Sequence, residues 1–378
     1  MTFRPLLVVN LGSSSLKFAV FDHRREVLRG LVDQFGPRAN VSLTAAGQTV
    51  VKVLPIKTAR GALGAMKRTL DHLRWQPVAV VHRLVHGGSN YTRPTKMTAS
   101  VRRRLQRLVP LAPLHLPLNI LAMDVTKRFW PRAATWGVFD TAAFAHLPLV
   151  AKTYALPLEL AAKYHIQKYG FHGLSHHWAL IQAAHHLGVR PSQLDAVTLH
   201  LGSGSSMALW RHGRPVETTM GFTPLEGLAM STRSGDIDPA IPLYLQQQAG
   251  LSAAAVTKLL EQQSGLFGLS GLRDMRDILD AAGHPVPGWP RRSWAATVRD
   301  HAQLALHVYL HDIRRYLSMY LGLLPTVPVV IFTGAIGQNR WLQGQILHRL
   351  PAAVGHHVLT VPTNEEQAIA DQIQPMVH

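Results

Sequence analysis

Two stretches of this sequence share a pattern that few folds accommodate: an apolar segment, a turn of glycine and serine, and a second apolar segment. The first stretch spans Leu6–Phe21 and the second spans Val197–Trp210, and their turns read NLGSSSL and HLGSGSSM. Short apolar runs on both sides of a glycine turn predict β-hairpins. Because the two hairpins lie far apart in the chain, they predict a duplicated α/β architecture with a cleft between its halves.

A third glycine turn follows another apolar segment. The β-branched run Val329–Thr333 is preceded by Pro328 and followed by a turn at 334–337. Proline suits the first position of a strand. Gln338 and Asn339 then indicate the start of a helix.

Length and composition limit the class of protein. A chain of 378 residues is too long for one ordinary core and predicts two domains. Helical patterns cover Ala254–Gln263 and Ser293–Leu317, and Ala281–Arg292 is a loop rich in proline and glycine. No apolar run is long enough to span a bilayer, and the N-terminus lacks the features of a signal peptide, so we expect a cytoplasmic protein. The absence of cysteine excludes disulfides and thiolate metal sites.

The formal net charge of +18 suits partners that carry negative charge. The basic residues are scattered, and their densest cluster comprises Arg102, Arg103, Arg104 and Arg107. We interpret this cluster as the solvated face of a helix, and we expect neither a nucleic acid partner nor a membrane partner. A positive field also attracts small anionic substrates.

The three turns have the composition of a phosphate-binding site. Small residues let backbone N–H groups approach phosphate oxygens closely. At the first turn, the serines at 13–15 add hydroxyl donors and Lys17 adds a positive charge. Asn10 is suited to orient water or phosphate near a metal. One such turn is commonly only a tight turn, whereas three at strand ends favour a nucleotide cradle. Their spacing does not match a P-loop.

Four short motifs place an arginine or a histidine among apolar or glycine neighbours, namely HRLVHGG, LAPLHLP, YGFHGLSHH and STRSGDIDP. A lone histidine of this kind is usually a core residue. Phosphoryl transfer, however, needs several donors around the oxygens of the moving group. We expect Arg83 and Arg233 to clamp that group. His172, His115 and His200 are candidates for further hydrogen-bond donors.

Acidic residues are scarce, so those in unusual contexts are candidates for function. Asp140 follows a short predicted strand, and Glu365 and Glu366 lie in the motif PTNEE. A magnesium site needs one or two carboxylates together with water and phosphate oxygens. PTNEE also predicts the start of a helix with Thr363 or Asn364 as its N-cap. Both interpretations can hold together.

Taken together, these motifs resemble those of the acetate kinase family, within the superfamily of acetate and sugar kinases, actin and heat-shock ATPases. The resemblance runs from NLGSSSLKFAVFD to PTNEE and includes, in the family's order, HRLVHGG, LAPLHLP, FDTAAF, YGFHGLSH, TMGFTPLEGLAMSTRSGDIDP and DMRDI. It implies an α/β fold with a duplicated actin-like (ribonuclease H-like) two-domain architecture and an interdomain cleft. The N-terminal domain would comprise residues 1–148, completed by a C-terminal helix at 365–378. The nucleotide-binding domain would comprise residues 149–364.

The resemblance also implies roles for individual residues. Together with the expected donor His115, the catalytic residues would be Asp140, His172, Arg233 and Arg83. The substrate's methyl group would lie in an apolar pocket beside Arg83, lined by Val85, Leu114, Phe171 and Pro224. The nucleotide site would comprise Lys17, His200, Leu201, Gly202, Ser203, Gly204, Asp274, Met275, Arg276, Ala335, Ile336, Gly337, Gln338 and Asn339. Asn10 and Glu365 would hold Mg²⁺.

The implied activity is that of an acetate kinase, which reversibly transfers the terminal phosphoryl group of ATP to acetate or propionate. The products would be an acyl phosphate, such as acetyl phosphate, and ADP; Mg²⁺ and a homodimer are also implied. A carboxylate is ionised at neutral pH and attacks the γ-phosphorus in line without a general base. We therefore interpret Asp140 as a residue that positions an arginine or the metal. An apolar pocket discriminates weakly between acids, because one methylene changes binding by about 1–3 kcal/mol.

Several positions depart from the family's pattern. Ser203 and Leu116 each replace an asparagine, Gln338 replaces a glutamate and Glu217 replaces an aspartate. Three alternatives therefore stay open. The chain could be a kinase for a longer acid such as butyrate, a nucleotide-binding paralogue of low activity, or a nucleic acid binder, the last motivated only by the net charge.

Overall fold

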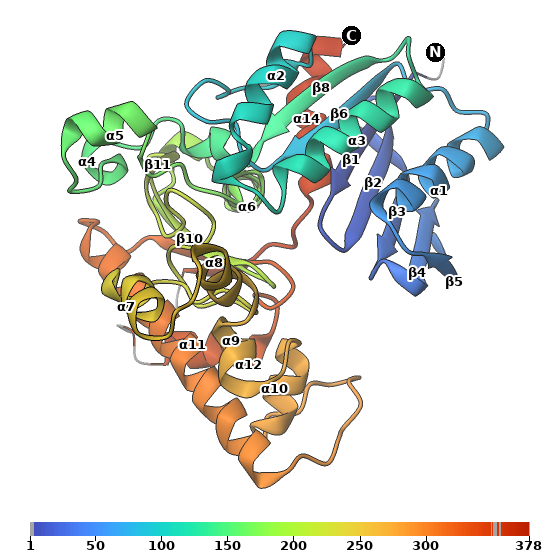
Figure 1. Ribbon diagram of the computed structural model, residues 1–378. Coiled ribbons are helices and arrows are strands. Elements are labelled where there is room, and N and C mark those ends of the chain that lie inside the picture. The colour runs from blue at the N-terminus through green and yellow to red at the C-terminus, as the bar shows by residue number, and fades with distance from the viewer. Residues whose placement is uncertain (1–3, 349, 351–353, 355–356, 378) are drawn as a thin grey trace. The chain divides into compact units, whose positions relative to one another are not determined.

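The chain separates into two compact units, each built around one β-sheet (Figure 1). The computed structural model describes residues 4–348, 350, 354 and 357–377. The first unit extends to Ala145 and takes in Phe171–Leu174 and the segment from Asn364 onward, and the second consists of His146–Gly170 and Ser175–Thr363. A division of the functional domains at residue 148 stays a prediction.

The first unit contains eight strands in one sheet, with the order β5-β4-β3-β2-β1-β6-β8-β7. The strands are β1 (Pro5–Leu11), β2 (Ser15–Asp22), β3 (Arg25–Asp33), β4 (Gly36–Ala45), β5 (Gln48–Ile56), β6 (Ala79–Leu84), β7 (Thr95–Lys96) and β8 (Ala134–Phe139). The helices are α1 (Ala59–His72), α2 (Ala99–Arg107), α3 (Leu116–Phe129) and α14 (Glu365–Val377), with 3₁₀ turns η1 (Val109–Leu111) and η2 (Asp140–Phe144).

Strand β1 is the centre of the first unit, and every residue in it is buried. Leu7 and Val9 pack with α1 and α3, whereas Leu6 and Val8 pack with α14 on the opposite face (Figure 1). A strand covered on both faces needs a continuous apolar run rather than an alternating one. This requirement explains the sequence PLLVV before Asn10, the polar residue that β1 delivers near its carboxyl end.

The second unit has a sheet of five strands in the order β11-β10-β9-β12-β13. They are β9 (Ala196–Leu201), β10 (Ser205–Arg211), β11 (Arg214–Thr218), β12 (Val329–Thr333) and β13 (Val358–Thr360). Its helices are α4 (Leu149–Lys152), α5 (Leu158–Tyr164), α6 (Gly173–His186, whose first two residues belong to the first unit), α7 (Ala240–Gln248), α8 (Ala253–Gln262), α9 (Gly265–Ser270), α10 (Met275–Ala281), α11 (Ala296–Gly322) and α12 (Arg340–Leu347), with a 3₁₀ turn η3 (Pro191–Gln193).

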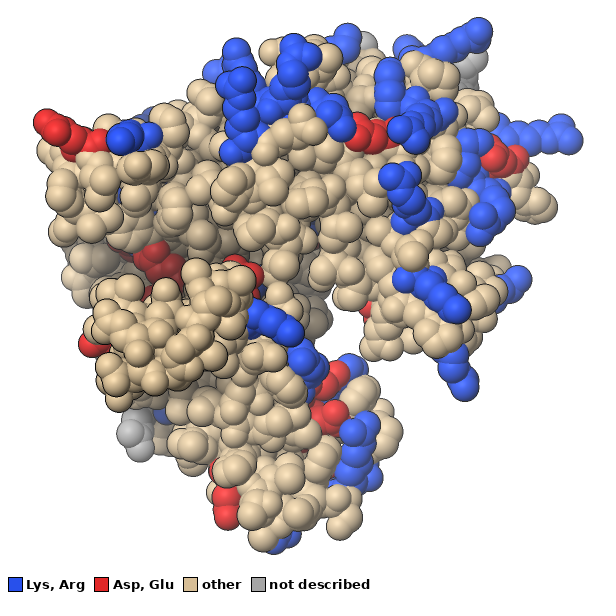
Figure 2. All heavy atoms as spheres, viewed as in Figure 1, with Lys and Arg blue, Asp and Glu red and all other residues tan. Residues whose placement is uncertain are grey.

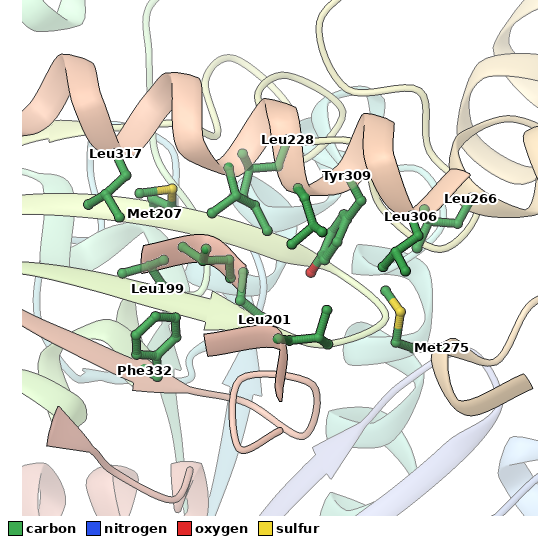
Figure 3. Close-up of a cluster of buried hydrophobic side chains, with 14 of the residues drawn as sticks. Leu199, Leu201, Met207, Leu228, Leu266, Met275, Leu306, Tyr309, Leu317 and Phe332 are labelled. Atoms are coloured by element: carbon green, nitrogen blue, oxygen red, sulfur yellow. The ribbon is translucent and has the colours of Figure 1, made fainter. Parts of the chain in front are cut away.

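The core of the second unit lies between its sheet and the long helix α11 (Figure 3). Alternate residues of β9, such as Leu199 and Leu201, face this core beside Tyr309 of α11. Thr198, which precedes Leu199 and so faces the other side of β9, shares a 2.8 Å hydrogen bond with His176 of α6. Because side chains alternate between the two faces of a strand, one face of β9 packs against α11 and the other contacts α6.

The two sheets repeat one topology. In the first, the order β3-β2-β1 is antiparallel, and β6 and β8 then add parallel to β1. In the second, β11-β10-β9 is antiparallel, and β12 and β13 add parallel to β9. The predicted duplicated α/β architecture is therefore confirmed. Both predicted hairpins are present, as β1–β2 and β9–β10, and the predicted third strand is β12.

On the face of the molecule that Figure 2 shows, exposed arginines and lysines lie at many places, with fewer acidic residues among them. On α2, Arg103, Arg104 and Arg107 are exposed, whereas Arg102 pairs with Asp124 at 2.6 Å. This arrangement agrees with a solvated helix face. None of the helices in the described part of the chain has both the length and the hydropathy that crossing a membrane requires.

Candidate active site

In the first unit, the predicted residues Arg83 and Asp140 form a bidentate ion pair. Arg83 Nε donates to Asp140 Oδ1 at 3.0 Å, and Nη2 donates to Oδ2 at 2.7 Å. Register explains the contact, because Arg83 in β6 pairs with Val138 in the parallel strand β8, and Asp140 follows that strand. Asp140 is 1% exposed.

Two further predicted residues join this pair from distant parts of the chain. Arg83 Nη1 donates to Glu365 Oε2 at 2.6 Å. Asn10 Nδ2 donates to Glu365 Oε2 and to Glu366 Oε1, both at 3.0 Å. Glu365 and Glu366 are the first residues of α14, so the PTNEE motif is a helix start as predicted. The N-cap role falls to Asn364, whose Oδ1 accepts from the backbone N–H of Gln367 at 3.1 Å.

The charges of these residues influence one another strongly. Burial disfavours the charge of Arg83, but Asp140 and Glu365 outweigh burial and raise its pKa, so that it stays protonated. Burial raises the pKa of Asp140, Arg83 opposes that rise, and Glu365 adds to it. A buried carboxylate that loses its cationic partner is left as an uncompensated charge, which strongly destabilises the folded state. Arg83 is that partner.

The donor set fits a hard divalent cation that is shared with phosphate. Asp140, Glu365 and Glu366 meet Asn10 and the guanidinium groups of Arg83 and Arg29, so three carboxylates face two guanidinium groups at this place. Mg²⁺ typically takes one or two protein carboxylates and completes its shell with water and substrate phosphates. Within the described residues, no group of three or more His, Asp or Glu side chains has the arrangement of a metal site by itself. A cation here would therefore need oxygen ligands from a bound nucleotide or from water.

His172 lies close to Asp140 through a tight backbone contact. A Cβ atom at Gly173 would lie only 2.0 Å from the carbonyl oxygen of Asp140, so only glycine permits this approach. His172 itself has φ of 55°, a left-handed conformation that is uncommon for residues other than glycine. Such strained backbone often occurs at functional sites. The adjacent Phe171 is buried and meets the ring of His86 edge-on at 5.4 Å.

The other candidates in the first unit surround the start of α3. His115 occupies the N-cap position of this helix. The backbone N–H of Val85 donates to Asn119 Oδ1 of α3 at 3.1 Å. Leu114 is 38% exposed, whereas Leu116, which departs from the family's pattern, is buried. Leu116 therefore packs as a core residue.

Arg233 and Pro224 belong to the second unit. The guanidinium of Arg233 contacts the carbonyl oxygen of Pro224 at 3.4 Å and the sulfur of Met230 at 3.5 Å. Burial lowers the pKa of Arg233, and Glu261 partly offsets this effect. A Cβ atom at Gly265 would lie 2.4 Å from the carbonyl oxygen of Arg233, so α9 supports the Arg233 backbone closely. A meeting of Arg233 with Arg83 and His172 at one anion stays a prediction.

The second unit contains a pocket of about 510 Å³. Nine of the predicted nucleotide-site residues line it: Gly202, Ser203, Asp274, Met275, Arg276, Ala335, Ile336, Gln338 and Asn339. The rest of its lining is Ser231, Leu266, Arg273, Leu279, Val286 and Leu342. The lining therefore combines apolar side chains with glycine, serine and amide groups and with the charged residues Arg273, Asp274 and Arg276.

Two glycine turns meet beside this pocket. The N–H groups of Ile336 and Gly337 donate to the carbonyl oxygen of Leu201 at 2.9 and 3.1 Å. A Cβ atom at Gly334, where φ is 85°, would lie 2.3 Å from the same oxygen. The pocket thus depends on glycine in the third turn, as the sequence pattern suggests.

The remaining predicted nucleotide residues are not among those that line the pocket. Lys17 is an exposed residue of β2 in the first unit and pairs with Asn10 in the strand register. His200 Nδ1 and Ser175 Oγ share a 2.7 Å hydrogen bond. The side chain of Leu201 is in the core, so its contribution to a cradle would come from its backbone. Gly204 accepts from the N–H of Gly202 across the turn at 3.1 Å.

Sequence reasoning missed two parts of these sites. Arg29 of β3 contacts Glu366 and Asn364 at the start of α14. The loop between α10 and α11 contributes Val286 to the pocket, and its Trp289 lies under the guanidinium of Arg276 at 3.6 Å. The proline and glycine content predicted the loop. No motif, however, indicated that Arg29 contacts the start of α14 or that the loop borders the pocket.

The repeated sheet order and the glycine turns at its strand ends define an actin-like α/β fold of the kind that phosphotransferases use. Comparison with known proteins supports this class. The family model described as the acetokinase family matches residues 5–350. The chain belongs to the acetokinase family, whose members are carboxylate kinases.

Individual relatives cover nearly the whole chain. An acetate kinase from Coprothermobacter proteolyticus is 39% identical over 88% of this chain and 84% of its own length. A propionate kinase structure from Francisella tularensis has a TM-score of 0.86 at 31% identity, with 98% of each chain covered. An acetate kinase structure from Porphyromonas gingivalis has a TM-score of 0.83 at 30% identity and covers 99% of this chain and 100% of its own.

Proposed function

We propose that this chain transfers the terminal phosphoryl group of ATP to acetate or propionate, and that it does so reversibly in the cytoplasm, where ATP is supplied. The observation that carries the proposal is the orientation of Arg83, which Asp140 and Glu365 hold through three hydrogen bonds. A guanidinium fixed in this way is preorganised for a carboxylate or phosphoryl group. Membership of a carboxylate kinase family supports the same conclusion.

In this proposal, the substrate carboxylate binds beside Arg83 and attacks the γ-phosphorus in line. It is already ionised at neutral pH, so no side chain needs to remove a proton. Asp140 positions Arg83, while His172 and Arg233 donate hydrogen bonds to the moving group. Asn10 and Glu365 would hold Mg²⁺, which, when bound, neutralises charge on the phosphate oxygens.

The proposed site for ATP is the 510 Å³ pocket of the second unit. Its apolar lining residues, among them Leu266, Leu279 and Val286, suit a nucleobase. Its glycine and serine residues, Gly202, Ser203 and Ser231, suit phosphates, because small residues expose backbone N–H groups. Asp274 caps α10 and forms a bidentate pair with Arg276, which fixes the rim of the pocket.

The decisive experiment is an acyl phosphate assay that traps the product with hydroxylamine. Purified protein with ATP and Mg²⁺ should form acyl phosphate from acetate or propionate, and kcat/KM should be compared across C2 to C5 acids. A preference for C4 or C5 would favour a butyrate-type kinase. Nucleotide binding in calorimetry without acyl phosphate from any of these acids would instead support a binding paralogue and would overturn the proposed activity.

We also propose a homodimer, with α4 and α5 at its interface. Val150 is 89% exposed and Leu158 is 74% exposed, although both are large and apolar. Adjacent exposed apolar side chains are typical of interfaces. Light scattering coupled to size-exclusion chromatography should give twice the mass of one chain. Val150→Glu should shift the measured mass toward that of a single chain. A monomeric wild type would contradict this assembly.

A further inference from the structure

Arg29 holds the start of α14 against the sheet of the first unit. Its Nη2 donates to Asn364 Oδ1 at 2.8 Å and its Nη1 donates to Glu366 Oε2 at 3.1 Å. Its Nε donates to Glu26 Oε1 at 2.9 Å, so Glu26 fixes the guanidinium from the side of β3. The same Asn364 oxygen caps the helix. One side chain therefore contacts both the cap and the first turn of α14.

Glu366 connects Arg29 to Asn10, because it accepts hydrogen bonds from both. One oxygen of Glu366 accepts from Arg29, and the other accepts from Asn10 Nδ2 at 3.0 Å. Asn10 Nδ2 also donates to Glu365. Because both glutamates take the amide nitrogen, the amide oxygen must point away from them, and it lies 3.4 Å from Arg83 Nη1. The contacts thus settle which end of the Asn10 amide faces the glutamates.

The charges explain why Arg29 is needed there. Glu365 and Glu366 are adjacent in the sequence, and both are buried. Arg83 pairs with Glu365 and Asp140, whereas the ion pair of Glu366 is with Arg29. Without Arg29, Glu366 would repel Glu365 or would turn away from Asn10.

We propose that Arg29 is a positioning residue that acts through Glu366 to present Asn10 and Glu365 to a divalent cation. This inference rests on the proposed function, in which those two residues hold the metal. Partners behind metal ligands typically change metal affinity about 10- to 100-fold when they are removed. In this role Arg29 acts only through Glu366 and does not itself contact the substrate.

The test measures metal binding directly. Mn²⁺ replaces Mg²⁺ as the probe, and free Mn²⁺ is followed by electron paramagnetic resonance during titration of the protein with ATP present. Arg29→Met should raise the Mn²⁺ dissociation constant about 10-fold or more. Arg29→Lys should restore only part of the affinity, because one ammonium cannot contact Glu26, Glu366 and Asn364 with the same fork geometry.

Arg25→Met is the matched control. Arg25 is an exposed residue of the same strand, and its removal changes the net charge by the same amount. It should leave the Mn²⁺ dissociation constant unchanged. Calorimetry with ATP and EDTA should give equal nucleotide affinity for the wild type and Arg29→Met, since the metal-free nucleotide does not need Asn10 to be oriented.

A double-variant cycle tests the route through Glu366. Glu366→Gln alone should weaken Mn²⁺ binding, and adding Arg29→Met to it should cause little further loss. A purely structural role for Arg29 predicts a different outcome, in which Arg29→Met lowers the melting temperature but folded protein binds Mn²⁺ as the wild type does. Additive losses in the double variant would also overturn the proposal.

The outcomes separate this inference from the proposed function. If the wild type binds Mn²⁺ with ATP but forms no acyl phosphate, the activity fails while the Arg29 comparison can still be made. If acyl phosphate forms normally and Arg29→Met retains wild-type Mn²⁺ affinity, the activity stands and the role of Arg29 is wrong.

Discussion

Arg83 and Asp140 are joined by two hydrogen bonds, Nε–Oδ1 at 3.0 Å and Nη2–Oδ2 at 2.7 Å. A third guanidinium nitrogen donates to Glu365, which comes from the opposite end of the chain. Residues from the segment after β8 and from α14 therefore fix the guanidinium that β6 contributes. This rigidity is what electrostatic catalysis requires, because preorganised donors need no reorientation during the reaction.

The first prediction concerns the geometry of this pair. Arg83→Lys keeps the positive charge but loses the planar fork, so it cannot bind Asp140 and Glu365 in the same way. We expect kcat/KM for acyl phosphate formation to fall by about two to three orders of magnitude. Steady-state kinetics at saturating ATP and Mg²⁺ would measure it.

Arg102→Lys provides the matched control. Arg102 forms a similar bidentate pair with Asp124, at 2.7 and 2.6 Å, but both side chains are about one-third exposed. It should retain wild-type kinetics. Normal turnover by Arg83→Lys would exclude the clamp from the mechanism.

The second prediction concerns the approach of α6 to Asp140. In Gly173→Ala, the new methyl group would lie 2.0 Å from the Asp140 carbonyl oxygen and 2.8 Å from the Ala143 Cβ. The helix start must move, and His172 moves with it. We expect a loss of about 1–3 kcal/mol in the free energy of unfolding, measured in urea, together with a large loss of activity.

Gly344→Ala serves as its control. Gly344 lies inside α12, and nothing lies within 4 Å of the position of an added Cβ. Alanine is a better helix former than glycine, so this variant should be up to about 1 kcal/mol more stable. Wild-type stability and activity in Gly173→Ala would show that the close contact is not tight.

The sequence predicted those parts of the fold that depend only on short apolar runs and on the turn residues next to them. The hairpins β1–β2 and β9–β10 follow from apolar runs around glycine, and β12 follows from a β-branched run after proline. It also indicated Arg83, Asp140 and Glu365, because each lies in an unusual local context. Their contacts depend on strand register and on the return of α14 to β1, which no local pattern encodes.

Arg29 illustrates what the sequence could not give. It lies in a half-buried strand among ordinary surface charges, and only the position of α14 makes it a partner of Glu366. The pocket loop is a second case. Its proline and glycine predicted irregular structure. The two hydrogen bonds that attach it to α10, however, join indoles to aspartates that lie 12 and 14 residues away in the sequence, and no local pattern indicates such pairs.

The third prediction concerns that loop. Trp289 Nε1 donates to Asp277 Oδ1 at 2.9 Å, and the guanidinium of Arg276 stacks on the indole. Trp289→Ala removes both contacts, so Val286 should leave the pocket wall. We expect the KM for ATP to rise up to about 10-fold, the equivalent of about 1.4 kcal/mol, while the KM for the acid stays the same.

Arg291→Ala tests whether any change in this loop has that effect. Arg291 is exposed in the same loop, and its removal should leave both KM values unchanged. Calorimetry with ATP alone would check the result without turnover. An unaltered ATP affinity in Trp289→Ala would mean that the loop does not shape the pocket.

The fourth prediction concerns the dependence of stability on pH. His86 is fully buried, and burial lowers its pKa to about 4. In the unfolded chain a histidine binds a proton below about pH 6.5. Between these values the unfolded state binds more protons, so the free energy of unfolding falls as pH decreases from about 6.5 to 4. Above about 6.5 the imidazole is neutral in both states and contributes no slope.

His86→Asn isolates this contribution. The Nδ1 atom of His86 accepts from the backbone N–H of Gly88 at 2.9 Å, and the amide oxygen of asparagine can take its place. Asparagine does not titrate, so the free energy of unfolding of the variant should fall less steeply than that of the wild type, by up to about 1.4 kcal/mol per pH unit between pH 6 and 5. His82, whose pKa burial lowers to about 3, keeps its own slope in both proteins. Equal slopes for the variant and the wild type in urea titrations would mean that His86 is protonated in the folded protein, against its buried position beside Phe171.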